Sequence, residues 1–60
     1  MKTPTAFEVK RARERAALTQ LEASRLVYVR LNSWQRYESG TREMHPAIWE
    51  LFLMKARGAT

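Results

Sequence analysis

The chain contains no cysteine and, among its 60 residues, only one histidine, two glycines and two prolines. The absence of cysteine excludes disulfide bonds and thiolate metal ligands, and one histidine cannot form a usual zinc site. No apolar run is long enough to cross a membrane, and the N-terminus lacks the apolar core of a signal peptide. These absences predict one domain that works without a cofactor in a reducing cytoplasm.

Residues suited to catalysis are also scarce. All six acidic residues are glutamates, and their spacing suits helix caps, ion pairs and surface charge rather than a cluster. They are Glu8, Glu14, Glu22, Glu38, Glu43 and Glu50. The sequence has no Gly-rich phosphate loop and no nucleophile beside a base. We therefore expect neither an enzyme nor a site for a small molecule.

Positive charge is in excess. Lysine and arginine together number 11 against 6 acidic residues, which gives a formal net charge of +5. A small basic domain is suited to bind polyanions, because its cations displace condensed counterions from phosphates. Charge alone does not identify the partner, since many ribosomal and secreted proteins are equally basic.

Two Thr-x-x-Glu patterns mark the starts of helices. Thr5 and Glu8 form one capping box, which predicts a helix that runs to about Ala17, and Thr19 and Glu22 form another. In each box two backbone N–H groups at the start of a helix, which would otherwise have no partner, are satisfied. The pattern therefore predicts two helices in the first half of the chain.

A turn is expected after the second helix, over Val27–Arg30. This segment contains no Gly, Asn or Pro, the residues that normally form such turns. Residue propensity alone would favour a strand over Leu26–Leu31. We favour the turn, because one isolated strand would have no partner.

Glycine and proline set the bounds of the remaining helices. A third helix is expected over Leu31–Ser39, ended by Gly40 in the left-handed conformation. Pro46 suits the first position of a last helix, expected over residues 46–57 and stopped by Gly58. The sequence thus predicts a single compact all-α domain over residues 1–60, with four helices or five.

The segment from Leu18-Thr19-Gln20 to Glu38-Ser39-Gly40 resembles the Cro and phage-repressor (XRE-like) type of helix-turn-helix domain, without a gap. The resemblance covers about residues 9–43 and, more loosely, the last helix. It implies a lambda-repressor-like fold with the helix-turn-helix at about residues 19–39. In that family the second helix crosses the DNA backbone and the third lies in the major groove. The string from Ser33 to Gly40 is similar to a subgroup that includes anti-CRISPR-associated repressors.

The resemblance implies five base-contacting residues at the third helix: Arg30, Leu31, Asn32, Ser33 and Arg36. Arg36 offers a two-pronged hydrogen bond to guanine, Asn32 offers one to adenine, and Leu31 suits a thymine methyl group. Two alternatives stay open. In one, Leu31 packs beneath Trp34. In the other, Asn32 caps the helix together with Gln35, so the helix starts later and Asn32 contacts no base. Arg30 then becomes more important, as a phosphate or base contact at the start of the helix.

Four residues are expected at phosphates: Thr19, Gln20, Thr41 and Arg42. Gln20 begins the second helix, where its amide and the helix N-terminus favour an anion. Thr41 and Arg42 follow the third helix, in the loop where the family meets the DNA backbone again. The alternative for Gln20 and for Arg42 is an ordinary solvated side chain.

Arg13 lies on the otherwise apolar stripe of the first helix, where an unpaired charge is unfavourable. The family pairs an arginine of this helix with the glutamate of its Glu-x-Gly ending. The resemblance therefore implies a partly buried ion pair between Arg13 and Glu38 that holds the first helix against the third.

The last helix is apolar beyond one face. One stripe is expected to face the core: Trp49, Phe52, Leu53 and Ala56. The rest are expected to lie exposed in a monomer: Ile48, Leu51 and Met54, with Met44. Such a patch predicts an interface, and a homodimer is the economical one, since two-fold symmetry matches a palindromic operator. The alternatives are a loosely packed surface helix and a domain whose missing partner covers the patch.

The leading hypothesis is a dimeric, sequence-specific repressor that binds double-stranded DNA. It would come from a phage or other mobile element, act in the bacterial cytoplasm and nucleoid, and have its own promoter among its candidate targets. A second hypothesis is an antitoxin-like protein-interaction module that uses the last helix. A third is unspecific coating of RNA or DNA, which predicts tolerance of changes at Asn32 and Ser33.

Overall fold

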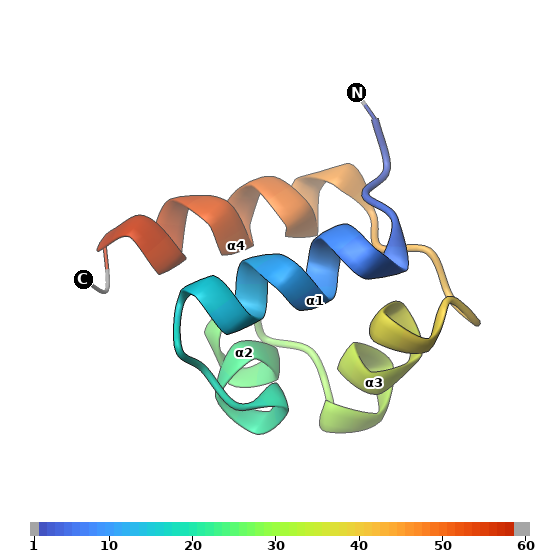
Figure 1. Cartoon of the computed structure of the whole chain (residues 1–60), viewed down its shortest axis with the longest axis horizontal. Coiled ribbons are helices and arrows are strands. Elements are labelled where there is room, and N and C mark those ends of the chain that lie inside the picture. The colour runs from blue at the N-terminus through green and yellow to red at the C-terminus, as the bar shows by residue number, and fades with distance from the viewer. Residues whose placement is uncertain (1, 59–60) are drawn as a thin grey trace.

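Four helices follow one another in the computed structural model, which describes residues 2–58 (Figure 1). They are α1 (Ala6–Arg15), α2 (Gln20–Leu26), α3 (Leu31–Ser39) and α4 (Pro46–Gly58). The described residues include no strand. The predicted all-α fold of four helices is therefore confirmed, and the strand considered over Leu26–Leu31 does not form. Over residues 2–58, no helix combines the length and the apolarity needed to cross a membrane.

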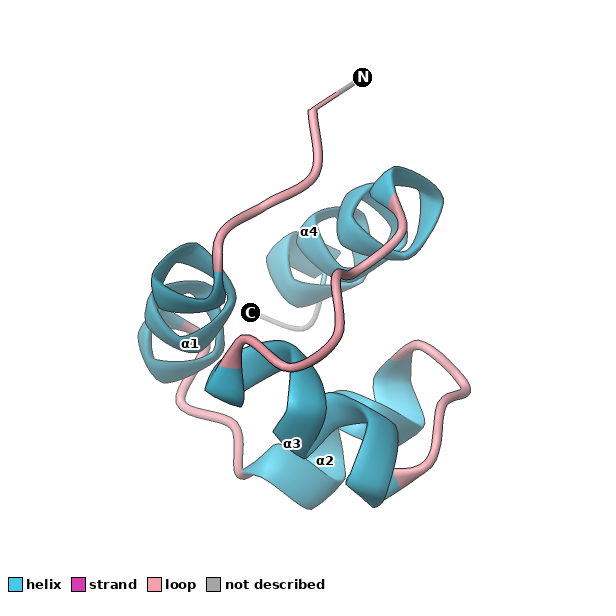
Figure 2. Ribbon diagram, turned by 90° about the vertical axis from the view of Figure 1, so that its right-hand side faces the viewer, coloured by secondary structure: helices cyan, strands magenta, loops and turns pink. Residues whose placement is uncertain are grey.

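The helices form two levels. α3 packs against α1 and α2, and α4 packs against α2. Figures 1 and 2 show the α2–α3 pair as a base, with α1 and α4 lying over it as two separate rods. Ala23 and Ser24 are buried on α2, where side chains this small let the neighbouring helices approach closely.

Aromatic side chains fill the core between the helices. Trp34 and Phe52 are fully buried with ring centroids 5.1 Å apart, and Tyr37 meets Trp34 edge-on at 6.1 Å. These rings serve as core rather than as a platform for stacked bases. The other buried apolar residues are Val9, Ala23, Val27 and Met44. The expectation that Met44 is exposed is wrong, because this loop side chain packs into the core.

Both predicted capping boxes are present. In the first, Glu8 N–H donates to Thr5 Oγ1 at 3.1 Å, and Thr5 N–H donates to Glu8 Oε1 at 2.8 Å. Thr19 and Glu22 repeat this arrangement at 3.1 and 2.9 Å. The backbone N–H groups favour the ionised carboxylates, so the pKa values of Glu8 and Glu22 lie below their ordinary value.

Residues with positive φ end α1 and α2. Ala17 has φ 57° and Tyr28 has φ 62°, although neither is glycine. At both places, backbone N–H groups bond to carbonyls three and five residues earlier, which is the Schellman pattern. The predicted turn over Val27–Arg30 is confirmed. α1 ends at Arg15 rather than near Ala17, because Ala17 has left the helical conformation.

Replacing Ala17 by glycine should stabilise the protein. The left-handed conformation costs an L-residue about 1–2 kcal/mol, and glycine avoids this at a smaller entropic cost. We expect Ala17→Gly to raise the free energy of unfolding by up to about 1 kcal/mol and Tm by about 4–8 °C. Ala47→Gly is the matched control, since Ala47 is an exposed alanine inside α4, and it should lower Tm. Equal effects of the two substitutions in thermal denaturation would contradict a strained Ala17.

α3 begins at Leu31, with Arg30 in an extended conformation at the N-cap position. Asn32 therefore lies inside the first turn, and the alternative in which it caps the helix is wrong. The Arg30 side chain has no acceptor atom for a capping hydrogen bond, so the first turn of α3 lacks the stabilisation that α1 and α2 have. At the other end Gly40 adopts φ 83°, as predicted.

Candidate nucleic-acid interface

Glu38 is the centre of a hydrogen-bond network that joins three helices. Its Oε2 accepts from Arg13 Nε on α1 and from Trp34 Nε1 on α3, both at 2.5 Å. Its Oε1 accepts from Arg13 Nη2 at 3.2 Å and from Gln20 Nε2 on α2 at 3.0 Å. Arg13 Nη1 also donates to the Leu18 carbonyl at 2.9 Å. This network holds α1, α2 and α3 in fixed relative positions.

The predicted ion pair is confirmed and largely shielded from water. The side chains of Arg13 and Glu38 are 15% and 6% exposed. Burial by itself raises the pKa of Glu38, but the bonds from Arg13, Trp34 and Gln20 outweigh it, so this pKa lies below its ordinary value. The same carboxylate raises the pKa of Arg13. Because each carboxylate oxygen has two donors, neither charge is buried alone.

Burial of one side of α3 leaves its other side to solvent. Trp34 and Tyr37 are buried, and Ser33 lies half-buried at the edge. The exposed side consists of Leu31, Asn32, Gln35, Arg36 and Ser39. Leu31 lies outside the core cluster, which contradicts the alternative in which it packs beneath Trp34. Four of the five predicted base-contacting residues thus belong to α3, and only Ser33 is partly covered.

Gln35 lies on this exposed side and was not foreseen as a contact residue. The only role expected for Gln35 was that of a capping partner of Asn32. The helical period identifies it, because it follows Leu31 by four residues and Asn32 by three and so shares their surface. Its amide can donate and accept, which is the pairing that adenine offers in the major groove.

Exposed residues continue at both ends of α3. Arg30 precedes the helix, and Thr41 and Arg42 follow it. Thr41 Oγ1 and Ser39 Oγ share a hydrogen bond of 2.9 Å, and Ser39 Oγ also donates to the Arg36 carbonyl at 3.1 Å. These bonds anchor the loop to the last turn of the helix. Cations therefore flank the exposed side of α3 at both ends.

Thr19 and Gln20, the expected phosphate contacts at the start of α2, both have structural roles. Thr19 Oγ1 caps α2, and Gln20 Nε2 donates to Glu38. The link between Gln20 and Glu38 was not foreseen. An amide nitrogen carries two hydrogens, and the bond to Glu38 uses one of them.

Lys55 of α4 ties the last helix to the turn between α2 and α3. Its Nζ donates to the Leu26 carbonyl at 3.0 Å and to the Tyr28 hydroxyl at 2.5 Å. It also lies 3.9 Å from the centroid of the Tyr28 ring, which adds a cation–π contact. Tyr28 is otherwise 79% exposed. The geometry of the turn therefore depends on α4 as well as on the turn's own residues.

The apolar patch predicted on α4 is smaller than expected. Met54 is 67% exposed, but Ile48 and Leu51 are half-buried and pack against the core. The expectation that all three lie open in a monomer is wrong for Ile48 and Leu51. The reason is that α4 is covered by the other helices over more than one of its stripes.

No protein-family model matches the chain. A stretch of 49 residues is 39% identical to part of the type II methyltransferase M.MspI of a Moraxella species. The match covers 82% of this chain and 12% of that protein. The chain thus spans a small fraction of the length of the relative it matches. The similarity relates this domain to one segment of a much larger protein.

The uncapped start of α3 yields a prediction that separates stability from binding. Arg30→Ser supplies an N-cap acceptor, so we expect a gain of about 1 kcal/mol in unfolding free energy. The same change removes a cation beside the exposed side of α3, and it should weaken binding to DNA if that side is a DNA-binding surface. Arg25→Ser is the control, because it removes an equal charge from an exposed position of α2 without creating a cap. Thermal denaturation and DNA titration measure the two effects, and a loss of stability in Arg30→Ser would contradict the uncapped N-terminus.

Proposed function

We propose that this protein is a sequence-specific DNA-binding transcriptional repressor of the Cro and phage-repressor type. The observation that carries the proposal is the exposed polar side of α3, flanked by Arg30 and Arg42. The network around Glu38 supports it, because a helix that reads bases must be held at a defined angle by its neighbours. The resemblance from Leu18 to Gly40 supports it independently.

In this proposal α3 lies in the major groove. Arg36 forms a two-pronged hydrogen bond to guanine, Asn32 and Gln35 address adenine, and Leu31 contacts a thymine methyl group. Arg42, Thr41 and the start of α2 hold phosphates and set the register. Repression follows from occupancy: the bound protein blocks polymerase, and its own concentration sets the degree of repression. Its own promoter is a candidate target, as in an autoregulated phage or mobile element.

We further propose that the protein acts as a homodimer on a palindromic operator. One recognition helix reads only a few base pairs, and a two-fold dimer doubles the site. Met54 supplies an exposed apolar side chain for the interface, and the outer edges of Ile48 and Leu51 flank it. If the dimer neutralises about eight phosphates, log K falls against log salt concentration with a slope of about −7.

Selection of duplex DNA from a random pool tests the proposal. The purified protein is incubated with the pool at low salt, and the bound DNA is sequenced. We expect an enriched inverted repeat with half-sites about one helical turn apart, roughly 34 Å. A pool that binds without enrichment would support unspecific coating instead. A pool that does not bind at low salt would overturn the proposal.

The chain is similar to a segment that makes up 12% of a methyltransferase, and this similarity favours a second candidate function. A domain of this kind can serve as an accessory segment that adds a binding surface to a larger enzyme. Addition of the purified domain to an active methyltransferase would then change the enzyme's activity. The repressor proposal predicts no such effect.

The antitoxin-like module remains a third candidate, with Leu51 and Met54 at its docking surface. The double variant Arg36→Ala, Arg42→Ala discriminates it from the repressor. Loss of DNA binding with an intact fold supports the repressor. The module is supported if the double variant loses no measurable property and the protein copurifies with a partner until Leu51 and Met54 are replaced.

A further inference from the structure

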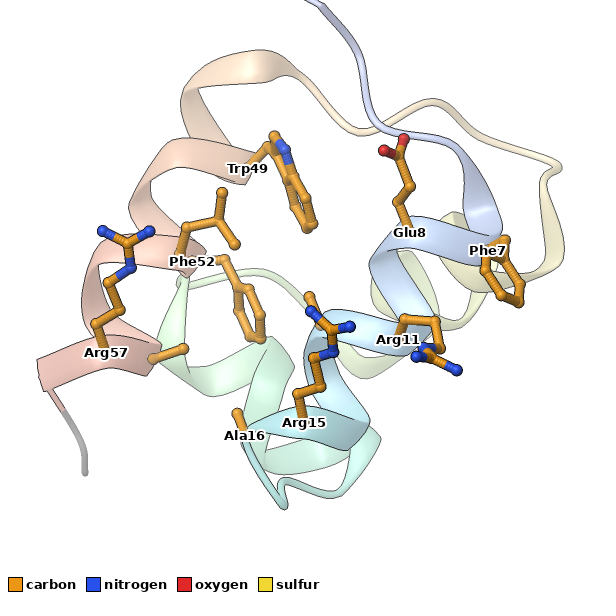
Figure 3. Close-up of a pocket in the computed structure, with 11 residues that line it drawn as sticks. Phe7, Glu8, Arg11, Arg15, Ala16, Trp49, Phe52 and Arg57 are labelled. Carbon is orange, nitrogen blue, oxygen red and sulfur yellow. The ribbon is translucent and has the colours of Figure 1, made fainter.

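An open groove of about 700 Å³ runs between α1 and α4 (Figure 3). Its lining residues belong to these two helices, apart from Ala16, which directly follows α1, and none belongs to α2 or α3. The groove therefore shares no residue with the surface proposed for DNA. A second ligand can be bound there without displacing the first.

The floor of the groove is apolar. Trp49 and Phe52 lie nearly parallel, with centroids 6.4 Å apart, and Leu53 lies beside them. Figure 3 shows the Trp49 and Phe52 rings turned from α4 toward α1. The other wall is shallow, because Ala12 of α1 and Ala16 directly after α1 have small side chains. Trp49 and Leu53 are half-buried, so apolar side chains of a ligand can reach them, whereas Phe52 is fully buried and supports Trp49 from the core.

The rim of the groove is basic. Arg11 and Arg15 lie along α1, are exposed, and have no carboxylate partner among the described residues. Arg57 stands on the rim of α4. Glu8 is the one acidic residue of the lining, and its carboxylate is committed to the N-cap of α1. A ligand that follows the groove therefore meets apolar surface at its centre and positive charge at its edge.

We propose that this groove binds an acidic amphipathic helix of a partner protein. An amphipathic helix places apolar side chains at positions i, i+3, i+4 and i+7 in such a groove, and its flanking carboxylates would face Arg11 and Arg15. A second copy of this chain is a poor occupant, because no helix of the described residues carries more acidic than basic side chains. A nucleic acid matches the arginines but leaves the apolar floor without apolar partners.

Selection from a displayed library of helical peptides tests the proposal without assuming the charge. The library fixes apolar residues at i, i+3, i+4 and i+7 over about four helical turns and randomises the flanking positions. We expect Asp and Glu to be enriched at the flanks. Binding of a selected peptide should shift the backbone amide resonances of α1 and α4 and the indole resonance of Trp49, and should leave those of α3 in place.

Charge reversal at the rim supplies the decisive variant. Arg11→Glu with Arg15→Glu should weaken the selected peptide by about tenfold or more. It should also let a peptide bind in which Lys replaces the flanking acids. The control is Lys10→Glu with Arg25→Glu, which changes the net charge equally at exposed residues outside the groove, and it should change the affinity much less.

Several outcomes would overturn the proposal. They are enrichment of neutral or basic flanks, resonance shifts confined to other helices, and equal weakening by the two double variants. Displacement of the peptide by duplex DNA, or by self-association of the chain, would assign the groove to another occupant. Operator binding depends on Arg36 and peptide binding on Arg11 and Arg15, so either proposal can fail alone.

Discussion

Replacement of Glu38 by glutamine should lower Tm by more than about 10 °C. The carboxylate accepts four hydrogen bonds from Arg13, Trp34 and Gln20. An amide offers one oxygen in place of two, so its NH2 group would face a donor, and Arg13 would lose its counter-charge. Breaking a shielded ion pair from one side costs on the order of 3 kcal/mol, and each kcal/mol shifts Tm by about 4–8 °C in a domain of this size.

The matched control is Glu43→Gln, which removes a carboxylate from an exposed loop position and should leave Tm nearly unchanged. A double-mutant cycle with Arg13→Met isolates the pair. The double variant should lose less stability than the two single variants lose together, because each single change leaves the other side chain without its partner. An unchanged melting curve of Glu38→Gln would refute the structural role of the network.

The pH dependence of stability follows from the same contacts. The pKa of Glu38 is lowered on folding, so its contribution is fully present above its unfolded pKa of about 4.3 and is lost as the pH falls through the folded value. The pKa values of Glu8 and Glu22 are also lowered, but these residues contribute equally to the pH dependence of the wild type and of the variant. The Tm difference between wild type and Glu38→Gln should therefore be large at neutral pH and should shrink below about pH 4. A constant difference across this range would contradict the lowered pKa.

The proposed function predicts that Arg36→Ala weakens selective operator binding strongly while the fold stays intact. Arg36 is exposed on α3, and its side chain has no role in the core. A lost two-pronged contact to guanine costs about 1–3 kcal/mol, and a dimer loses two of them, so operator affinity should fall by about thirtyfold or more. Titration of the selected operator measures this loss, with melting curves as the check on folding.

Two further substitutions serve as comparisons for Arg36→Ala. Lys10→Ala removes the same charge from α1 and should change operator affinity little. Arg42→Ala should weaken operator and random DNA alike and make the salt slope shallower by about one unit per subunit. If Arg36→Ala and Arg42→Ala behaved identically on both DNAs, Arg36 would be a phosphate contact and not a base reader.

Local patterns alone were enough to place four of the helix boundaries, although α1 ends at Arg15 and not near Ala17 as expected. Thr5 with Glu8 and Thr19 with Glu22 marked two starts, and Gly40 and Pro46 marked an end and a start, because capping and left-handed geometry involve only residues close in sequence. The turn at Tyr28 was located only by its flanking helices. No turn residue marks it, and a non-glycine residue takes its positive φ.

The tertiary structure decided what each surface can do. The resemblance paired Arg13 with Glu38, but only packing brought Gln20 and Trp34 to the same carboxylate. Periodicity described α4 as apolar on more than one face, yet it could not tell which neighbours cover Ile48 and Leu51. The basic groove likewise requires α1 and α4 to lie beside each other, although they stand far apart in the sequence. Caps depend on neighbours along the chain, whereas burial and shared hydrogen bonds depend on the packing of helices, and for that reason the sequence determined the elements and the fold determined the sites.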